Sequence, residues 1–373
     1  MSVPEALTDA LTVVRQHAER VDTEGVFPAE SIDALRSAGL FGLVLPADVG
    51  GLGAGPVEFV DVMCEVAAAC GSTAMVYLMH TAAAVTIAAA PPAAHSGLLE
   101  DLASGKALGT LAFSERGSRS HFWAPVSAAM VEGDQVHIKA DKSWVTSAGQ
   151  ADVYVVTAGS VTANAGEVDL YALPRDTPGL TVAGPWRGLG LRGNNSSPMT
   201  VDCSVPDGFR LGAAGGGFGT MMSTVLPWFN LGNAAVSLGL AQSATSAAIG
   251  HAGAARLEHL DQALSGLPTI RAQLARMAIA VEAQRSYLRH SAQSVAQPSD
   301  DTMLQVLGVK ASVNDAALQI TEAAMRVCGG AAFSKHLPIE RAFRDARAGS
   351  VMAPTADALY DFYGKAICGL PVF

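Results

Sequence analysis

The chain has 373 residues, of which half are hydrophobic and 16% are charged, and its formal net charge is -10 at pH 7. This length allows two or three domains with a large core. The acidic balance excludes nucleic acid as a partner, because that binding rests on basic patches. The five cysteines form no CxxC pair, which favours reduced structural thiols and argues against a metal site.

The most apolar stretch of the chain, Met75 to Ala94, is mostly alanine and is interrupted by His80 and by Pro91-Pro92. We therefore expect no membrane span. The N-terminus has neither a basic segment nor an apolar one behind it, so the sequence predicts no signal peptide and a cytoplasmic protein.

Residues 1–107 are expected to form an all-helical N-terminal domain. Apolar residues recur at alternating intervals of four and three, as on one face of a helix: Leu7, Leu11, Val14, Ala18 and Val21. A loop rich in turn-forming residues follows at 46–53, and a long alanine-rich helical region comes after it.

Residues 108–212 change to short β-type runs that turn residues separate. These runs are residues 136–138, 153–156, 170–173 and 199–203. Short strands at close spacing predict a small β-sandwich or barrel as the central domain.

Residues 213–373 return to helical periodicity. Apolar residues are again spaced by four and three, in the series Ile270, Leu274, Met277 and Val281 and the series Val309, Val313, Ala316, Ile320, Ala323 and Val327. Gly329-Gly330 predicts the end of the second helix. The fold class is therefore α+β and multidomain: an N-terminal helical domain, a central β domain and a C-terminal four-helix bundle.

Common nucleotide and hydrolase motifs do not explain the chain. Gly188, Gly190 and Gly193 fit GxGxxG, but a dinucleotide fold needs a strand before this motif and a helix after it. Here Pro185-Trp-Arg187 precedes the motif and a β-type run follows it. The sequence contains no P-loop, no HExxH and no GxSxG elbow.

Several segments resemble the signatures of acyl-CoA dehydrogenases, in the order and at the separations of that family. They are LRSAGLFGLVLPADVGGLG (35–53), LAFSERGSRSH (111–121), DKSWVTSAG (141–149), LGLRGNNSSPMTVDCSVP (189–206) and RVCGGAAFSKHLPIERAFRDAR (326–347). The resemblance covers nearly the whole chain and repeats the α–β–α order. It implies a homotetramer or homodimer with FAD between the β domain and the bundle, and with part of the FAD contacts supplied by a neighbouring subunit.

The resemblance also places the cofactor contacts. Phe113, Ser114 and Ser120 are expected along the flavin and its ribityl chain, and Trp144 and Thr146 against the isoalloxazine ring, with Thr146 near N5. Further contacts are expected from Arg326, Gly329, Gly330 and Thr355, of which the glycine pair would let a neighbour's FAD diphosphate approach the backbone. A flavin needs an apolar cover and a few polar donors, and Ser114, Trp144 and Thr146 supply both. The alternative for Trp144 is a core residue of a strand.

The expected catalytic glutamate is missing. The family takes this base from Y-E-G-T, and its position here is Ala353, which cannot accept a proton. The alternative position of the base, on an earlier helix, falls in the segment 228–233, which has no carboxylate. The catalytic base is therefore unknown, with three substitute candidates: Asp357, Glu115 and His121. The alternative for Asp357 is a charge at a helix N-terminus.

Other positions also depart from the family pattern. Asn230 stands where the family has the Arg of an Asp-x-x-Arg that meets the CoA nucleotide, and the R-x-x-F-G around Arg256 is missing. Arg326 replaces a Gln, and it can bind a diphosphate more strongly. Arg119 and His121 replace a Gly and an Asp, which predicts a reshaped substrate end of the pocket.

Three functions remain open at this point. The first is an FAD-dependent oxidoreductase that desaturates an acyl thioester, carried by CoA or a carrier protein, by proton abstraction and hydride transfer to flavin N5. The second is a flavin-dependent monooxygenase, or another non-dehydrogenase on the same fold, which the loss of the base would permit. The third is a non-catalytic FAD-binding protein. The substrate and the electron acceptor are left open, because function depends on the site and not on the fold.

Overall fold

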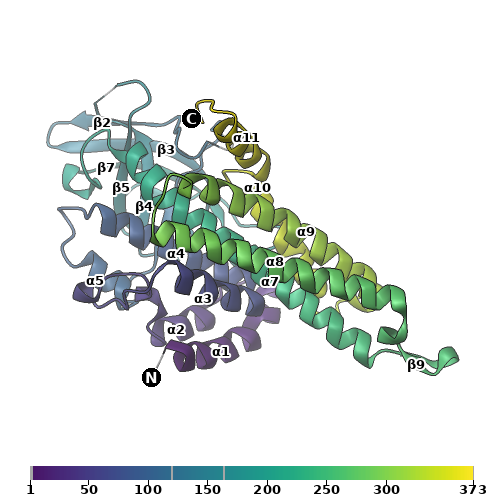
Figure 1. Cartoon of the computed structure of the whole chain (residues 1–373). Coiled ribbons are helices and arrows are strands. Elements are labelled where there is room, and N and C mark those ends of the chain that lie inside the picture. Colours follow the sequence, from purple (N-terminus) through teal and green to yellow (C-terminus); the bar gives the residue numbers. More distant parts are fainter. Residues whose placement is uncertain (1–2, 119–120, 163, 373) are drawn as a thin grey trace.

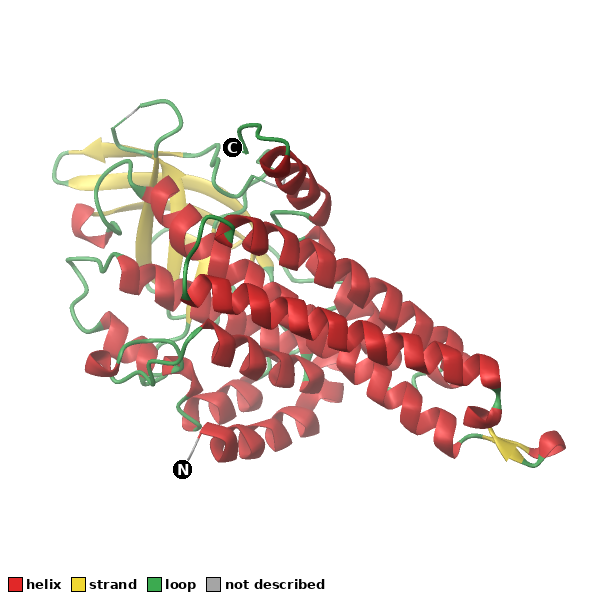
Figure 2. Cartoon of the chain, viewed as in Figure 1, coloured by secondary structure: helices red, strands yellow, loops and turns green. Residues whose placement is uncertain are grey.

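The computed structural model describes residues 3–118, 121–162 and 164–372, in which a helical domain, a β domain and a second helical domain follow one another (Figure 1). The sheet lies at one end of the molecule and the long helices extend away from it (Figure 2). The order α, β, α and the fold class predicted from the sequence are confirmed.

The N-terminal domain consists of α1 (Val3–Glu24), α2 (Ala29–Ser37), α3 (Pro56–Ala69), α4 (Gly71–Ala89) and α5 (Leu98–Ala103), with 3-10 turns η1 (Leu40–Gly42) and η2 (Ala47–Val49). The predicted apolar face of α1 is confirmed, since Leu11, Val14, Ala18 and Val21 are buried.

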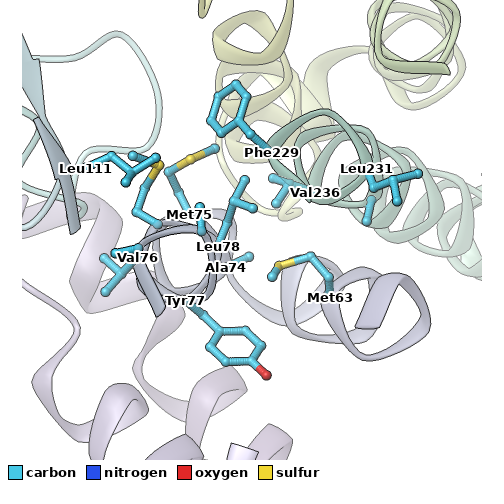
Figure 3. Close-up of a cluster of buried hydrophobic side chains, with 14 of the residues drawn as sticks. Met63, Ala74, Met75, Val76, Tyr77, Leu78, Leu111, Phe229, Leu231 and Val236 are labelled. Carbon is cyan, nitrogen blue, oxygen red and sulfur yellow. The ribbon is translucent and has the colours of Figure 1, made fainter. Parts of the chain in front are cut away.

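Helix α4 is the central helix of the core. By length and composition it could cross a membrane, but 83% of its most apolar window is buried inside the protein, as in the core helix of a globular fold. Figure 3 shows Met75 on the side of α4 that faces Leu111 and Phe229, whereas Tyr77 points to the opposite side. The Tyr77 hydroxyl donates to the carbonyl of Leu40 at 2.7 Å, which satisfies its polar end.

The β domain consists of β1 (Gly109–Ala112), β2 (Ala128–Glu132), β3 (Gln135–Val145), β4 (Val153–Gly159), β5 (Val168–Pro174), β6 (Leu180–Val182) and β7 (Ser197–Pro206), followed by a 3-10 turn η3 (Asp207–Phe209). They form one sheet in the order β1-β4-β2-β3-β7-β6, with β5 beside β4. The four predicted runs lie in β3, β4, β5 and β7. A register shift between Lys142 and Val145 interrupts the pairing of β3 with β7, and such bulges redirect side chains.

The C-terminal domain begins with α6 (Gly217–Thr220) and the π-helical turn η4 (Met221–Val225). It continues with α7 (Leu226–Ala254), α8 (Pro268–Ala296), α9 (Thr302–Phe333), α10 (Ile339–Val351) and α11 (Ala356–Ile367). Between α7 and α8, the small hairpin of β8 (Arg256–Leu257) and β9 (Gln262–Ala263), with 3-10 turns η5 (Glu258–Leu260) and η6 (Leu264–Gly266), projects from the far end (Figure 1). The predicted stop at Gly329-Gly330 is a kink, with Gly329 at φ 51°, after which α9 resumes to Phe333.

Helix α10 joins all three domains. Arg344 donates two hydrogen bonds to the carboxylate of Asp22 on α1, at 2.9 and 2.6 Å. The next residue, Asp345, accepts a hydrogen bond of 2.6 Å from the backbone N–H of Leu191 in the β domain. A Cβ at Gly190 would lie 2.5 Å from the backbone of Arg344, so this close approach requires glycine. Gly190, the middle glycine of the GxGxxG match, therefore serves domain packing.

His80 is a structural histidine. Its Nδ1 accepts from the N–H of Gly109 at 3.2 Å, so its Nε2 carries the proton and donates to the carbonyl of Phe41 at 3.1 Å. Burial lowers the pKa of His80 to about 4, which keeps the ring neutral at physiological pH. The imidazole thus joins α4 to β1 and η1 without taking part in acid–base chemistry.

Candidate active site

A cavity of about 800 Å³ lies between the β domain and the helices. Its apolar wall is built by α4, β1, η4 and α7, which contribute Met75, Met79, Leu111, Val225 and Phe229. Met75, Leu111 and Phe229 gather on one side of α4 in Figure 3. Its polar wall comes from β3 and from the loop before β7. A mostly apolar cavity with a few convergent polar groups is typical of a small-molecule or cofactor site.

Trp144 forms an aromatic wall of the cavity. Its side chain is 64% exposed, although it is a large apolar residue on a strand, and it lies at the register shift of β3. Trp186 meets it edge to face, with ring centroids 6.2 Å apart, and donates its indole N–H to the carbonyl of Leu191. The exposure excludes the core-residue interpretation of Trp144 and leaves an indole surface available to a planar ligand.

Hydroxyl groups lie beside this indole. Ser114, Ser143, Thr146 and Ser196 all line the cavity. The Thr146 and Ser196 hydroxyls are 2.9 Å apart, and both residues are buried. Together with Trp144 they provide the apolar cover and the polar donors that a flavin ring system requires, so the residues present fit this cofactor.

Glu115 lines the cavity but is fully engaged with protein groups. Its Oε1 accepts from Lys142 Nζ at 2.5 Å, and its Oε2 accepts from the N–H groups of Val126 and Ser127 at 2.8 and 2.9 Å. Burial by itself would raise the pKa of Glu115, but the Lys142 ammonium and the Ser127 donors hold it below its usual value. Such a carboxylate is a poor proton acceptor.

Lys142 is the buried partner of this carboxylate. Besides Glu115, it donates to the carbonyl and the hydroxyl of Thr157 on β4, at 2.6 and 3.0 Å. Burial lowers the pKa of Lys142 to about 8, against the attraction of Glu115. The ion pair therefore fastens the segment after β1 to β3, two residues before Trp144.

Lys310 holds the segment that carries Ala353. This buried side chain donates to the carbonyls of Gly349, Met352 and Pro354 at 3.2, 2.9 and 2.6 Å. Burial lowers the pKa of Lys310 to about 7, and only the protonated form satisfies all three carbonyl oxygens. Ala353 itself lines the cavity. Position 353 is thus fixed at the cavity wall although its side chain has no acid–base group.

The structure brings together five of the residues predicted to contact the cofactor: Phe113, Ser114, Trp144, Thr146 and Thr355 all line the cavity. Ser120 lies outside the described residues. Arg326, Gly329 and Gly330 lie elsewhere, on α9, where all three are exposed. Their contact with a neighbour's cofactor stays a prediction.

The other two candidates for the base do not line the cavity. His121 is exposed and contacts Trp123 edge to face, with centroids 5.3 Å apart. Asp357 is exposed in the first turn of α11, as its alternative interpretation has it. Among the described residues that line the cavity, Glu115 is the one carboxylate, and no histidine lines it.

Sequence reasoning missed several cavity residues. Ser196 stands in the segment 189–206, where one more serine in a polar run carries no local signal. Trp186 and Arg187 lie in the loop before it, and they also line the cavity. The one signal in the sequence was Trp186, an aromatic residue just before the GxGxxG match.

Comparisons with known proteins agree along most of the chain. Models of the N-terminal, middle and C-terminal domains of acyl-CoA dehydrogenases match residues 8–106, 110–203 and 215–367. A probable acyl-CoA dehydrogenase of Bacillus subtilis (strain 168) is 30% identical over 343 residues, which are 90% of this chain and 88% of the relative. The mitochondrial short-chain specific acyl-CoA dehydrogenase of Homo sapiens is 28% identical over 370 residues, which are 96% of this chain and 89% of the relative.

A solved structure of an acyl-CoA dehydrogenase has the same fold. The butyryl-CoA dehydrogenase of Megasphaera elsdenii superimposes with a TM-score of 0.89 at 24% sequence identity, and the alignment covers 97% of this chain and 98% of that one. At this identity the likeness concerns the fold alone.

Proposed function

The chain belongs to the acyl-CoA dehydrogenase family, and we propose that it is an FAD-dependent oxidoreductase that acts on an acyl thioester. The observation that supports FAD most directly is the cavity wall in which the exposed indole of Trp144 lies beside the buried hydroxyls of Thr146 and Ser196. Hydroxyl donors beside an aromatic cover are what a flavin ring needs.

A bound flavin would supply a hydride acceptor for a substrate carbon. Trp144 would provide an aromatic cover for it, and Ser114 and Thr146 would provide hydrogen-bonding groups. Met75 and Phe229, with their neighbours on the apolar wall, would exclude water around an acyl group, which strengthens polar interactions in the site.

Desaturation also requires a base that removes a proton from the substrate α-carbon. The described cavity wall offers no free carboxylate for this role. Glu115 is engaged by Lys142 and two backbone N–H groups, and position 353 is alanine. This observation favours a second candidate, a flavin-dependent monooxygenase or another non-dehydrogenase, because such chemistry does not need a base at the substrate α-carbon. A non-catalytic FAD-binding protein is the third candidate.

Two measurements separate these candidates. Anaerobic mixing of the FAD-loaded protein with acyl-CoA of varied chain length should bleach the flavin absorbance if the chain desaturates acyl thioesters. No bleaching at any chain length, together with substrate-dependent oxygen uptake in the presence of an external flavin reductase, would instead identify a monooxygenase. Detection of either reaction removes the non-catalytic candidate.

We also propose a homotetramer or homodimer, located in the cytoplasm. Large apolar side chains remain exposed on the C-terminal domain, at Phe333 (83%) and Ile367 (64%). Phe333 follows the kink at Gly329, close to the glycine pair predicted to meet a neighbour's FAD. Exposed apolar groups of this size are typical of an interface between copies. Light scattering coupled to size-exclusion chromatography measures the assembly, and a monomer at micromolar concentration would refute it.

A further inference from the structure

The cavity wall carries positive charge that the protein does not fully compensate. Among the described residues that line the cavity, the charged ones are Glu115, Arg187, Arg344 and Arg347. Glu115 is paired with Lys142, and Arg344 is paired with two carboxylates. Arg187 and Arg347 form no ion pair with any described residue. Two cations of the wall therefore lack an anionic partner within the part of the chain that the structure describes.

These two arginines border the cavity where α10 meets the loop before β7. The contact between the two segments is a hydrogen bond of 3.2 Å from Nη1 of Arg344 to the carbonyl of Leu189. Arg187 stands two residues before Leu189, and Arg347 stands about one helical turn after Arg344. Arg187 is exposed and Arg347 is half-buried, so Arg187 lies at the rim and Arg347 further inside.

Arg347 is held in place through one of its terminal nitrogen atoms. Its Nη1 donates to the hydroxyl of Thr321 at 3.0 Å and to the carbonyl of Phe343 at 2.6 Å. The guanidinium also lies over the Phe343 ring, 3.3 Å from the ring centroid. Nε and Nη2 make no hydrogen bond to a described residue, and neither atom is enclosed by protein. The side chain is thus fixed while one edge of its guanidinium stays open.

The open edge is the one with which other arginines of this chain bind carboxylates. Arg210 donates from Nε and Nη2 to the two oxygens of Asp207, at 3.0 and 2.6 Å. Arg344 uses the same two atoms with Glu340, at 2.7 and 3.1 Å. Two parallel N–H groups on a planar guanidinium fit a carboxylate or a phosphate in this way. Arg347 has the same edge available at the cavity wall, with no carboxylate of the described chain on it.

Burial makes an anionic partner favourable for this cation. Loss of water lowers the pKa of Arg347, and the attraction of the exposed Glu322 opposes this only in part. We propose that Arg347, with Arg187 at the rim, binds an anionic oxygen group, a carboxylate or a phosphate, of a ligand whose apolar part lies in the cavity. The site goes beyond the proposed function, because it concerns binding and requires no flavin.

Calorimetric titration of the purified protein with three probes tests the site. The probes are hexanoate, hexyl phosphate and the uncharged hexanamide, which share one apolar tail. We expect at least one anion to bind about tenfold more tightly than hexanamide, because hydrogen bonds to charged groups are strong. A preference for hexanoate would identify a carboxylate ligand, and a preference for hexyl phosphate would identify a phosphate ligand.

Four variants locate the binding group. Arg347→Gln should abolish the preference for the anion, and Arg347→Lys should reduce it, because lysine keeps the charge but lacks the fork. Arg187→Gln should lower it by about twofold to threefold, because an exposed charge contributes less. The control is Arg341→Gln, on the same helix but outside the cavity wall, which should keep the wild-type preference.

Equal affinity for the three probes, or no binding of either anion, would overturn the inference. A preference that survives in folded Arg347→Gln would overturn it too, and so would an equal loss in Arg341→Gln, because the effect would then come from the general charge of α10. Circular dichroism checks the fold of each variant, and if Arg347→Gln does not fold, an unchanged preference in Arg347→Lys has the same consequence. Flavin bleaching tests the proposed function separately, so the two can fail independently.

Discussion

Replacing Lys142 with methionine isolates a buried carboxylate. In the folded protein the side chains of Lys142 and Glu115 are 0% and 1% exposed, and their charges are 2.5 Å apart. Removal of one partner from such a pair costs about 3–5 kcal/mol, because the other charge stays buried. With an unfolding entropy of about 2.1 cal/mol/K per residue, 4 kcal/mol corresponds to about 5 °C in Tm for the 373-residue chain.

The assay is thermal unfolding of Lys142→Met, Glu115→Gln and the double variant, followed by circular dichroism. We expect the double variant to lose much less than the sum of the single losses, because it buries no unpaired charge. The control is Lys139→Met on the same strand, where the side chain is 74% exposed and a change below about 0.5 kcal/mol is expected. Additive losses in the double variant would refute the pairing argument.

Three further predictions concern Asp345 at the contact between α10 and the β domain, Trp144 in the cavity wall, and Ala353. Burial raises the pKa of Asp345 from 3.8 to about 6, so the folded state binds the proton more tightly and this contribution to stability falls as pH rises through 6. The difference of about two pKa units is about 3 kcal/mol in all, of which about 2 kcal/mol falls between pH 4.5 and 7. Over this range Asp345→Asn should lose less Tm than wild type, and an identical slope would contradict the assignment. Trp144→Ala should weaken FAD binding by about 10-fold or more in a fluorescence titration, with the Tm of the apoprotein unchanged because the side chain is exposed; equal affinity would remove Trp144 from the ring wall. Ala353→Glu should accelerate anaerobic bleaching by acyl-CoA by about 100-fold, and a stopped-flow rate no faster than wild type would refute a missing base at this position.

Local periodicity predicted the elements because burial follows spacing within one helix or strand. Val14 and Val21 are buried in α1 for this reason, and β4 is recognisable from its apolar run. The predicted helix end at Gly329-Gly330 was wrong, because α9 continues to Phe333 beyond a kink at Gly329: a single glycine with positive φ can interrupt a helix without ending it.

The cavity residues Trp144 and Thr146 were predictable because the short segment that resembles the family carries them two positions apart. Their partners were not. Ser196 is 50 positions from Thr146, and Leu191 is 154 positions from Asp345. The first contact depends on how β3 pairs with β7, and the second on how α10 meets the β domain; no periodicity in the sequence encodes either arrangement.

The same limit applies to the candidate base Glu115. A carboxylate next to a cofactor segment resembles an acid–base group until its partners are known. The structure gives it a lysine, a serine hydroxyl and two backbone N–H groups, which together make it a structural anion. The chemical type of a residue therefore predicted where it lies and did not predict what it does.

At position 353 the backbone is held in place at the cavity wall, but the side chain has no acid–base group. Lys310 holds the carbonyls on both sides of Ala353, at Met352 and Pro354, and these contacts involve backbone atoms alone. The segment would keep its place with any side chain at 353 that the cavity can accommodate. The resemblance implies a carboxylate at this position, and the alanine that stands there offers no proton acceptor to the cavity. We infer that such a site suits a substrate whose oxidation needs no base at the α-carbon, or a substrate that carries its own base.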